Sequence, residues 1–569
     1  MKIKNKKKYL IDWRFYFLVF AIIFLFLCLL VRSFFVQVIS SDHLSREQDL
    51  RSLRSVAAKS ERGFIFDRNG EVLAASSSLR TIWIDPMQVE LQQDADSFIL
   101  WQSLADILSI NKDQLLAKIK SKQEQGKRFI YLKRQVSTGI ANAIKDLGLA
   151  GIHVQKESKR FYPEGEVLST VIGFTGLDNV GIEGLEKLYN NTLSSYASLH
   201  KVRKSRDGLV VKYIDHPVQV KAVDDVYLSI DQRLQNIAYL ELKKSAAKFR
   251  AKSSSVVIIN PNTGEVLALA NTPSYNPNKA LPKNHYNMLN HAVTDAFESG
   301  SVIKPLVAAI ALENKYIKKD IKISTYPGYL KDDKGNIIAK DPRHYGSLSI
   351  SDILRKSSNV GISKVATKVP PSVMYNWFVK FGLGSKTSLQ LSGESTGLMN
   401  YKQISRNKRS YAAFSFGYGF SATLMQLMNI YCVIANDGYQ VPFTLTKLTK
   451  KPVYNKLISS DTAKYIRESL VDVVERGTAR RARIKGYVVA GKTGTARKAT
   501  AGGYGDQYVN VFIGMAPADN PKLVVGVLIN EPQGDLYHSG EVAAPVFSSI
   551  LSASLSILNI ESNSVISSD

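Results

Sequence analysis

Three short segments of the chain carry side chains that together could perform acyl transfer through a serine. The first is Ser301-Val302-Ile303-Lys304, whose spacing places a hydroxyl and an amine one turn apart on one helical face. The residues through Asn314 are apolar almost all round, which predicts a buried helix. Because burial disfavours a charged ammonium, Lys304 should lose proton affinity and could act as a neutral base. The first helical turn leaves backbone N–H groups unpaired, so the N–H of Ser301 could stabilise an oxyanion.

The other two segments supply further polar groups. Ser357-Ser358-Asn359 lies between two helical stretches and would, by itself, be read as a helix cap. Lys492-Thr493-Gly494-Thr495 directly follows a predicted strand, Tyr487–Ala490, and its glycine leaves a strand edge bare for a peptide to pair with. The ordered set S-x-x-K, S-x-N and K-T-G-T predicts a serine–lysine acyl-transfer site that works without histidine.

S-x-x-K spacing alone is weak evidence, because it also begins at Ser109, Ser198 and Ser405. None of those three serines opens a helix that is apolar on all sides. A second coincidence is Gly486–Thr493, which matches the phosphate-loop pattern. Its middle residues favour a strand and a poor helix follows, so nucleotide binding is rejected.

Metal and cofactor chemistry is not indicated. The eight histidines show no H-x-x-x-H or H-E-x-x-H spacing. The two cysteines, Cys28 and Cys432, exclude a disulfide-built scaffold and a thiolate zinc site, and we expect no disulfide between them. We therefore expect no metal and no cofactor.

The amino-terminal residues predict a membrane anchor. Lysines and Arg14 precede an uncharged run, Phe15–Val31, which is closed by Arg32. A cleaved signal peptide is the alternative, but no small-x-small cleavage site follows the run. The lysines before the span predict a cytoplasmic amino end, with the bulk of the chain across the membrane.

The length of the chain limits the number of folded units, and its net charge limits the kind of partner. The chain has 569 residues, which suggests two or three folded units, and a net charge of +26. So basic a protein should meet an anionic partner, unless much of the charge is simply solvated. Since most of that charge would lie outside the cytoplasm, we expect lipid headgroups or an acidic cell-wall material and no nucleic acid.

The elements that must position the three segments can be read from hydrophobic patterning. Residues 41 to about 225 are mixed and polar, with strand-like runs such as Thr81–Ile84 and one helix near Phe98–Ile119. Strands at both ends of the remainder, with helices between, predict one sheet closed by non-local pairing. The expected strands are Val226–Ile230, Ser255–Ile259, Glu265–Ala270, Tyr487–Ala490, Tyr508–Met515 and Leu523–Ile529, and the expected helices are Asp231–Lys244, Ser301–Asn314, 350–356, 360–369 and 460–475.

At this point the sequence resembles the penicillin-binding proteins, specifically the class B, single-pass transpeptidases, over nearly its whole length. Arg62–Gly70 with Val72-Leu73-Ala74 looks like the first motif of their pedestal domain. One departure is Ser299, which stands where the family usually has proline, and we expect it to have little effect. Further matching stretches are Arg160–Gly165, Gly181–Glu186, Asn276–Asn278, Phe381–Gly384, Gly417–Gly419 and Ala543–Phe547.

The resemblance implies a role for each site residue. Ser301 would attack the D-Ala–D-Ala carbonyl of a peptidoglycan stem peptide, or of a β-lactam, which would stay bound covalently. Lys304 would take its proton, and Ser357 would relay a proton to the leaving D-alanine. Lys492 would provide the electrostatic environment for this proton relay. Asn359 would bind the substrate amide.

The K-T-G-T segment would bind the substrate's end. Thr493 and Thr495 would hold the terminal carboxylate beside Gly494, and the N–H groups of Ser301 and Thr495 would form the oxyanion hole. The other implied ligand is the lipid-linked precursor, and the implied partners are a membrane glycan polymerase and division-complex proteins.

The resemblance also implies the architecture. A transpeptidase domain of α+β class, similar to serine β-lactamases, would hold a central antiparallel sheet flanked by helices, preceded by an elongated, mostly-β pedestal and one transmembrane helix. The expected bounds are a cytoplasmic basic tail at 1–14, the anchor at 15–35, the pedestal (dimerisation-type) domain at 41–225, the transpeptidase domain at 226–558 and a tail at 559–569. The chain would be a single-pass protein of the inner membrane with a periplasmic catalytic domain.

Within class B, Ser357–Val360 and Gly491–Arg497 look most like the division-specific members, which predicts septal cross-linking. The elongation-type members are the closest alternative. An acylable scaffold or β-lactam sensor would need a signalling part, which the short amino tail does not supply. A β-lactamase would need a water-activating base, and no convincing E-x-x-x-N partner lies between the second and third motifs.

Overall fold

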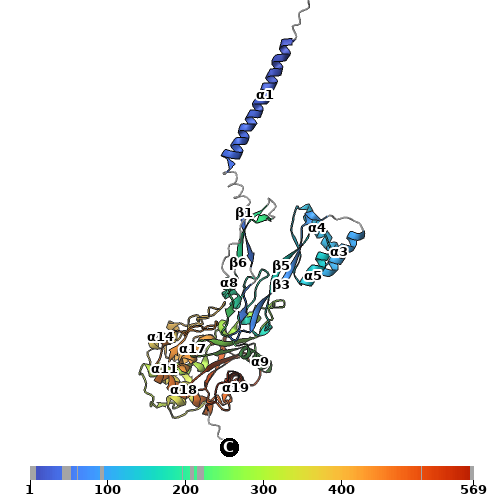
Figure 1. Ribbon diagram of the computed structural model, residues 1–569. Helices are drawn as coiled ribbons and strands as arrows, with labels where there is room; N and C mark the ends of the chain where they lie inside the picture. The colour runs from blue at the N-terminus through green and yellow to red at the C-terminus, as the bar shows by residue number, and fades with distance from the viewer. Residues whose placement is uncertain are drawn as a thin grey trace, which may run out of the picture. The chain divides into compact units, whose positions relative to one another are not determined.

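The computed structural model describes residues 8–41, 53–59, 62–89, 95–194, 196–204, 210–213, 223–500 and 503–563. The chain divides into two compact units (Figure 1). One consists of residues 1–60 and 195–223, and the other of residues 61–194 and 224–569. Parts of both predicted tails, residues 1–7 and 564–569, lie outside the described residues.

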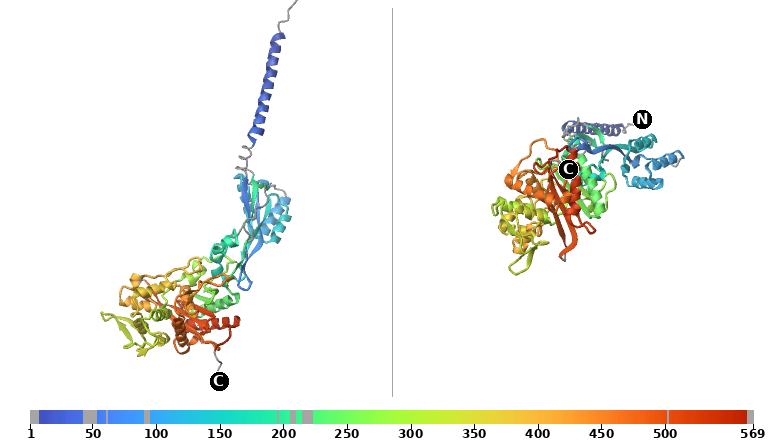
Figure 2. Two further views of the ribbon diagram at one scale, coloured as in Figure 1. Left: turned by 60° about the vertical axis from the view of Figure 1, so that its left-hand side comes forward. Right: turned by 90° about the horizontal axis from the view of Figure 1, so that it is seen from below.

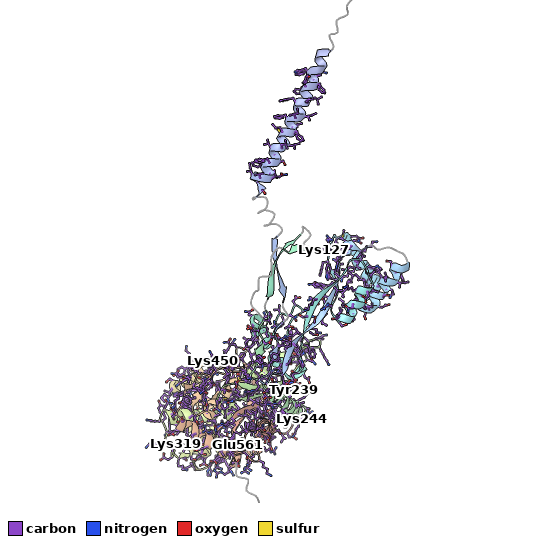
Figure 3. All side chains as sticks on the ribbon, viewed as in Figure 1. Lys127, Tyr239, Lys244, Lys319, Lys450 and Glu561 are labelled. Carbon is purple, nitrogen blue, oxygen red and sulfur yellow. The ribbon has the colours of Figure 1, made fainter. Side chains whose placement is uncertain are left out.

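The first unit begins with a long apolar helix. Helix α1 (Lys8–Phe34) is continued by a π-helical turn (Phe35–Ile39). Within the 27 residues from Trp13 to Ile39, an 18-residue stretch has a mean hydropathy of 2.8. None of the 27 residues is buried, and their side chains project on all sides (Figure 3). At about 1.5 Å per residue such a helix spans about 40 Å, which exceeds a hydrocarbon core of about 30 Å. The predicted anchor segment therefore lies in a helix long and apolar enough to cross a membrane.

The same unit contains a three-stranded antiparallel sheet. Strand β6 (Tyr196–Lys204) lies in the middle, paired with β1 (Leu53–Lys59) and with β7 (Val210–Tyr213). Its strands thus come from segments about 140 residues apart in the chain.

The second unit opens with a mostly antiparallel five-stranded sheet built around one long strand, β3, which pairs with β2, β4 and β5. The predicted strand Thr81–Ile84 is the end of β3. The predicted strand Val226–Ile230 is only two residues long, and it joins this sheet parallel to β2. The strand bounds are β2 (Ile65–Phe66), β3 (Val72–Ile84), β4 (Ile130–Val136), β5 (Ile152–Phe161) and β8 (Val226–Tyr227).

The helix predicted at Phe98–Ile119 is wrong as a single element, because the structure has two helices, α3 (Ala95–Leu108) and α4 (Lys112–Glu124). Ser109 adopts a left-handed backbone conformation with φ 52°. Asn111 then caps α4 by accepting a hydrogen bond from the backbone N–H of Gln114. Together with α5 (Thr138–Asp146), these helices enclose a separate small core with β3 and β4.

A buried ionic cluster joins three of the sequence stretches that resemble the pedestal motifs, namely Arg62–Gly70, Arg160–Gly165 and Gly181–Glu186. The Glu186 carboxylate accepts hydrogen bonds from Arg62 Nε at 2.5 Å and Arg160 Nε at 2.6 Å, and all three side chains are at most 1% exposed. Arg62 also donates to the backbone oxygen of Glu186. The carboxylate lets both arginines stay charged inside the protein, so three distant chain segments depend on it.

Residues 253–530 of the second unit contain a five-stranded sheet in the order β10-β9-β19-β18-β17, antiparallel throughout. Strand β9 pairs with β19, so segments about 270 residues apart lie side by side, as the green and red ribbons show (Figure 2). This confirms the predicted closure by non-local pairing. The strand bounds are β9 (Ser253–Ile259), β10 (Val266–Thr272), β17 (Ala490–Thr500), β18 (Gly503–Ala516) and β19 (Leu523–Asn530).

Helices cover both faces of this sheet. On one face, a Cβ added to Gly526 would lie 2.5 Å from Met428 Sδ of helix α17 (Leu424–Ala435). On the other, a Cβ on Gly514 would lie 2.7 Å from Phe547 Cζ of α19 (Ser539–Ile557), which packs against α9 (Gln232–Phe249). Glycine therefore lets each helix approach the strands closely.

The remaining predicted helices are present with small shifts of bounds. Asp231 caps α9 as expected, and its carboxylate accepts from the N–H of Arg233. The other helices are α6 (Ser169–Ile172), α7 (Gly184–Leu188), α8 (Asn190–Leu193), α10 (His291–Thr294), α11 (Lys304–Glu313), α12 (Ile350–Lys356), α13 (Asn359–Ala366), α14 (Pro371–Lys380), α15 (Tyr401–Ile404), α16 (Lys408–Ser415) and α18 (Ser460–Arg476). Short strands are β11 (Ile323–Ser324), β12 (Tyr329–Lys331), β13 (Ile337–Lys340), β14 (Ser347–Leu348), β15 (Tyr439–Gln440) and β16 (Asn455–Lys456).

The strand predicted at Tyr487–Ala490 is misplaced. Residues 487–489 lie outside the strand, which begins at Ala490 and runs to Thr500. The K-T-G-T segment consequently lies within β17 instead of following a strand, and β17 is an edge of the sheet.

Removing the shared carboxylate of the buried cluster should destabilise the protein strongly. Glu186→Ala leaves two arginines uncompensated, which typically costs about 3–5 kcal/mol, so the thermal midpoint of the full chain in detergent should fall by several degrees. Asp333→Ala is the control, since Asp333 pairs with Lys408 at the surface, where both side chains are more than 60% exposed. Equal midpoints for the two variants would show that the cluster does not stabilise the fold.

Candidate active site

The serine of the first segment lies at the start of a buried helix. Gly300–Ile303 form a 3-10 turn that leads directly into α11. The predicted helix 301–314 thus has a tighter first turn, in which residues three apart eclipse each other, so Lys304 lies beneath Ser301. Among the described residues, no hydrogen bond involves Ser301 Oγ, which leaves the hydroxyl open to the cavity that it lines.

Lys304 is completely buried. Its Nζ lies within hydrogen-bonding distance of the backbone oxygen of Ser357 at 2.6 Å, Ser357 Oγ at 3.3 Å and Asn359 Oδ1 at 2.7 Å. Burial lowers the pKa of Lys304 well below its usual value, and the nearby charge of Lys492 lowers it further, while Asp341 opposes the shift. The amine is therefore favoured in its neutral form, as the sequence predicted.

Lys492 approaches the same hydroxyl from the strand. Its Nζ donates to Ser357 Oγ at 3.1 Å and to the backbone oxygen of Thr493 at 3.2 Å. Burial lowers the pKa of Lys492 to about 7. Ser357 Oγ thus lies between two desolvated lysine amines, which is an arrangement suited to moving a proton.

The second segment is held in a strained turn. Ser357 ends α12 in the left-handed region with φ 56°, and Ser358 caps α13 by accepting from the N–H of Gly361. Asp341, which is only 3% exposed, accepts from the N–H of Asn359 at 2.6 Å and from Ser358 Oγ at 2.5 Å. The Asp341 carboxylate therefore fixes the turn that presents Ser357.

The third segment lies against the nucleophile's turn. A Cβ on Gly494 would lie 2.8 Å from the backbone oxygen of Ser299 and 2.9 Å from Val302 Cγ1, so only glycine permits this approach. Likewise a Cβ on Gly417 would lie 2.1 Å from the backbone oxygen of Gly300, whose φ is 55°. These contacts bring β17 and Ser301 to the same groove.

The threonine hydroxyls of β17 are oriented by hydroxyls from other elements. Thr493 Oγ1 lies 3.1 Å from Thr478 Oγ1. Thr495 Oγ1 lies 2.9 Å from Ser539 Oγ and accepts from the N–H of Ser539 at 3.0 Å. Ser539, at the start of α19, in turn hydrogen-bonds the backbone oxygen of Gly494 and Asn510 Oδ1.

A cavity of about 650 Å³ joins these groups. Five of the predicted site residues line it, while Lys304 and Lys492 lie buried behind Ser357, and Gly494 lies between the two lining threonines. Cationic side chains contribute to its wall, namely Lys356, Arg480 and Arg481. The predicted residues that line it are Ser301, Ser357, Asn359, Thr493 and Thr495.

Sequence reasoning missed Asp341, Thr478 and Ser539. Each stands outside the three motifs, and only the folded chain brings it to them. A lone Asp or Ser carries no spacing signal by which it could be found.

The other S-x-x-K serines lie in different settings. Ser109 follows the end of α3 and Ser405 ends α15, where its hydroxyl donates to the Tyr401 backbone oxygen. Ser198 lies in β6. Over the ranges described, no group of three or more His, Cys, Asp or Glu side chains could hold a metal ion.

Comparison with known families gives two matches. The penicillin-binding protein transpeptidase domain matches residues 254–552, more than half of the chain. The penicillin-binding protein dimerisation domain matches residues 57–228.

Individual relatives match over almost the full length. The peptidoglycan D,D-transpeptidase FtsI of Escherichia coli (strain K12) is 40% identical over 564 residues, 98% of this chain and 94% of the relative. A peptidoglycan synthetase structure from Bifidobacterium adolescentis has a TM-score of 0.70 at 25% identity, covering 90% of this chain and 98% of that one. The transpeptidase domain of Burkholderia pseudomallei penicillin-binding protein 3 has a TM-score of 0.54 at 35% identity, covering 59% of this chain and 98% of that domain.

With the S-x-x-K, S-x-N and K-T-G-T segments gathered around one groove, and with both family matches in the expected order, the chain belongs to the class B penicillin-binding protein transpeptidases.

Proposed function

We propose that the chain is a septal peptidoglycan D,D-transpeptidase, which cross-links stem peptides through an acyl-enzyme on Ser301 and is acylated by β-lactams at the same hydroxyl. The observation that carries this proposal is the buried amine of Lys304, one turn after Ser301, which contacts Ser357 and Asn359 where these two residues and Ser301 line one cavity. The family match supports the substrate class.

Acylation begins when Ser301 Oγ attacks the carbonyl between the two D-alanines. The hydroxyl proton passes to the neutral amine of Lys304 as the new ester bond forms. The N–H groups of Ser301 and Thr495 stabilise the oxyanion. This assignment fits Ser301 at the mouth of a helical turn, where its N–H has no helical partner.

Collapse of the intermediate expels D-alanine, whose nitrogen needs a proton. Ser357 Oγ supplies it and is reprotonated from the amines on either side, Lys304 at 3.3 Å and Lys492 at 3.1 Å. The Asn359 amide nitrogen donates to the substrate's peptide oxygen, since Asn359 Oδ1 is already occupied by Lys304. An amine from a second stem peptide then attacks the ester carbonyl, and the bond from that carbon to Ser301 Oγ breaks as the new amide forms. The proton that the amine loses passes through Lys304 to Ser301 Oγ, which restores the enzyme.

Substrate orientation follows from the open edge of β17. A peptide lying along this edge takes main-chain hydrogen bonds, and its terminal carboxylate meets the hydroxyls of Thr493 and Thr495. A β-lactam places its own carboxylate there. Because its leaving group stays tethered, the acyl-enzyme persists.

The domain bounds and membrane orientation belong to the same proposal. Residues 41–225 form the pedestal and 226–558 the transpeptidase domain, carried by the anchor at 15–35. The basic residues before the anchor keep the amino end in the cytoplasm and the catalytic domain in the periplasm. A membrane glycan polymerase and division-complex proteins are the partners, contacted through anchor and pedestal.

Replacing the nucleophile should abolish covalent labelling. Ser301→Ala removes the attacking hydroxyl, so labelling of the full chain by a fluorescent penicillin should be lost while the thermal midpoint stays near that of the unmodified protein. Ser405→Ala is the matched control, because Ser405 begins the same S-x-x-K pattern on the exposed surface. Undiminished labelling of Ser301→Ala would reject the assignment.

The division role predicts a cellular position. A fluorescent fusion of the full chain should collect at the division site, because septal cross-linking is confined to it. Even distribution along the side wall would assign the chain to elongation instead.

A further inference from the structure

Two buried polar side chains outside the three motifs lie behind the hydroxyl of Thr495. Ser539 is the first residue of α19 and is only 1% exposed, and Asn510, directly opposite Thr495 on β18, is not exposed at all. Ser539 Oγ lies 2.9 Å from Thr495 Oγ1 and 2.9 Å from Asn510 Oδ1. The three side chains therefore form a row that begins at Asn510, inside the protein, and ends at Thr495, in the wall of the catalytic cavity.

This row has fewer protons than acceptors around its central hydroxyl. Ser539 Oγ carries one proton, but Thr495 Oγ1, Asn510 Oδ1 and the backbone oxygen of Gly494 all lie within its hydrogen-bonding distance. The other end of the Asn510 amide, Nδ2, is buried and has no hydrogen-bond partner in the part of the chain that the structure describes. A buried donor without a partner, next to a crowded hydroxyl, is an unfavourable arrangement.

A half turn of the Asn510 amide resolves this crowding. The two ends of the amide have nearly the same shape, so the turn exchanges their positions without moving any neighbour. Nδ2 then donates to Ser539 Oγ across the same 2.9 Å. The proton of Ser539 is left for only two acceptors, the Gly494 oxygen and Thr495 Oγ1.

The hydroxyl of Thr495 is then constrained from the protein side. The backbone N–H of Ser539 donates to Thr495 Oγ1 at 3.0 Å, which occupies one of the two lone pairs of this oxygen. When Ser539 Oγ donates to the second lone pair, the proton of Thr495 must point elsewhere, and the cavity lies on its open side. A carboxylate only accepts hydrogen bonds, so it needs a hydroxyl that is held as a donor.

We propose that Asn510 and Ser539 are positioning residues for the substrate's terminal carboxylate. Asn510 Nδ2 donates to Ser539 Oγ, Ser539 Oγ donates to Thr495 Oγ1, and Thr495 Oγ1 donates to the carboxylate. This inference rests on the proposed function, which places the carboxylate at Thr495. In the empty site the proton of Ser539 donates to the Gly494 oxygen, and it turns to Thr495 when the anion arrives. Because each donor in such a chain is polarised by the one behind it, the final hydrogen bond is strengthened.

The test compares two forms of one penicillin, the free acid and its methyl ester, on the full chain. The rate at which each acylates Ser301 is measured by competition with a fluorescent penicillin. The ester keeps the β-lactam ring but has no carboxylate, so the ratio of the acid rate to the ester rate measures carboxylate recognition. Ser539→Ala should lower this ratio about 5-fold, the factor expected for one hydrogen bond between neutral groups.

The second residue of the row is tested in the same way. Asn510→Ala should lower the ratio by a smaller factor, because Ser539 can still donate to Thr495. The double variant should lower it no further than Ser539→Ala alone, since Asn510 acts only through Ser539.

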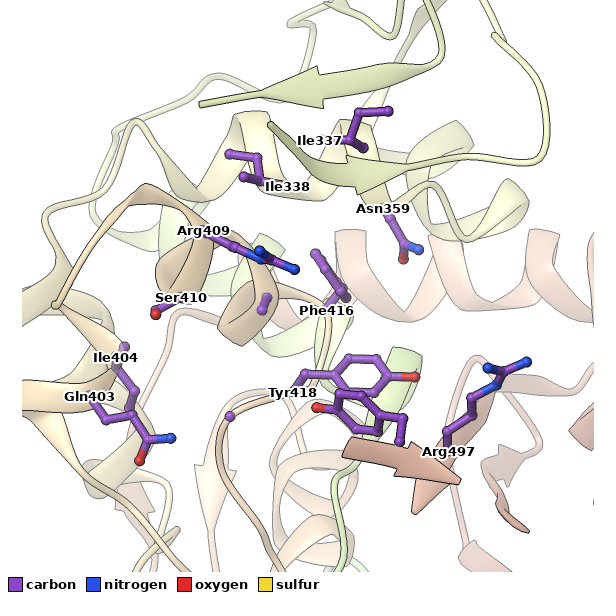
Figure 4. Close-up of a pocket in the computed structure, with 13 residues that line it drawn as sticks. Ile337, Ile338, Asn359, Gln403, Ile404, Arg409, Ser410, Phe416, Tyr418 and Arg497 are labelled. Carbon is purple, nitrogen blue, oxygen red and sulfur yellow. The ribbon is translucent and has the colours of Figure 1, made fainter. Parts of the chain in front are cut away.

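Two other serines serve as matched controls. Ser548 lies on the same helix, and its hydroxyl donates to the Arg483 backbone oxygen at 2.9 Å, outside the catalytic cavity. Ser410 lines a neighbouring cavity of about 550 Å³, to which Asn359 also contributes, and lies apart from Asn359 (Figure 4). Ser548→Ala and Ser410→Ala should each keep the ratio of the unmodified chain.

The ratio separates recognition from general damage, since a misfolded variant loses both ligands alike. An unchanged ratio in Ser539→Ala would overturn the relay while leaving the proposed function intact. A fall of the same size in either control would also overturn it, as would independent, additive losses in the double variant. If neither form of penicillin acylates Ser301 of the unmodified chain, the proposed function itself fails, and the relay fails with it.

Discussion

The structure around Ser301 depends on two lysine amines buried on either side of one hydroxyl. Lys304 and Lys492 both reach Ser357 Oγ, and neither side chain is exposed to solvent. Two ammonium groups this close in a low-dielectric interior repel each other strongly, so one of them gives up its proton. The pKa of each amine is lowered by burial, and that of Lys304 also by the charge of Lys492. Burial thus produces the base that a site without histidine needs.

Holding two amines in this position requires segments that are far apart in the chain. Lys304 comes from α11, Ser357 from the α12–α13 junction and Lys492 from β17. The non-local sheet holds β17 beside the 3-10 turn that leads into α11. Tyr431 of the fully buried helix α17 supports the nucleophile's turn by donating to the Val302 backbone oxygen at 2.8 Å. The tight approach of Gly494 to that turn allows no larger residue. A small change in sheet position would therefore separate the amines from the serine.

The sequence predicted much of this, but not all. The S-x-x-K spacing and the apolar run after it predicted a buried amine below a serine, because helical periodicity is a local property. The α3–α4 break was missed, since the capping role of Asn111 was hidden inside an otherwise helical pattern. The start of β17 was misplaced by a few residues, because Tyr487-Val488-Val489 has strand-like composition but does not pair in the sheet. Asp341 and Ser539 could not be predicted, as their contacts with the motifs exist only after long-range folding.

The central claim is that Lys304 is largely uncharged at neutral pH. The most direct measurement is the ¹³C chemical shift of its Cε as a function of pH in the full chain labelled with ε-¹³C-lysine, with the signal assigned by its loss in Lys304→Arg. A titration well below the ordinary lysine range is the predicted result. A Lys304 signal that titrates together with the surface lysines, near pH 10.5, would contradict the account.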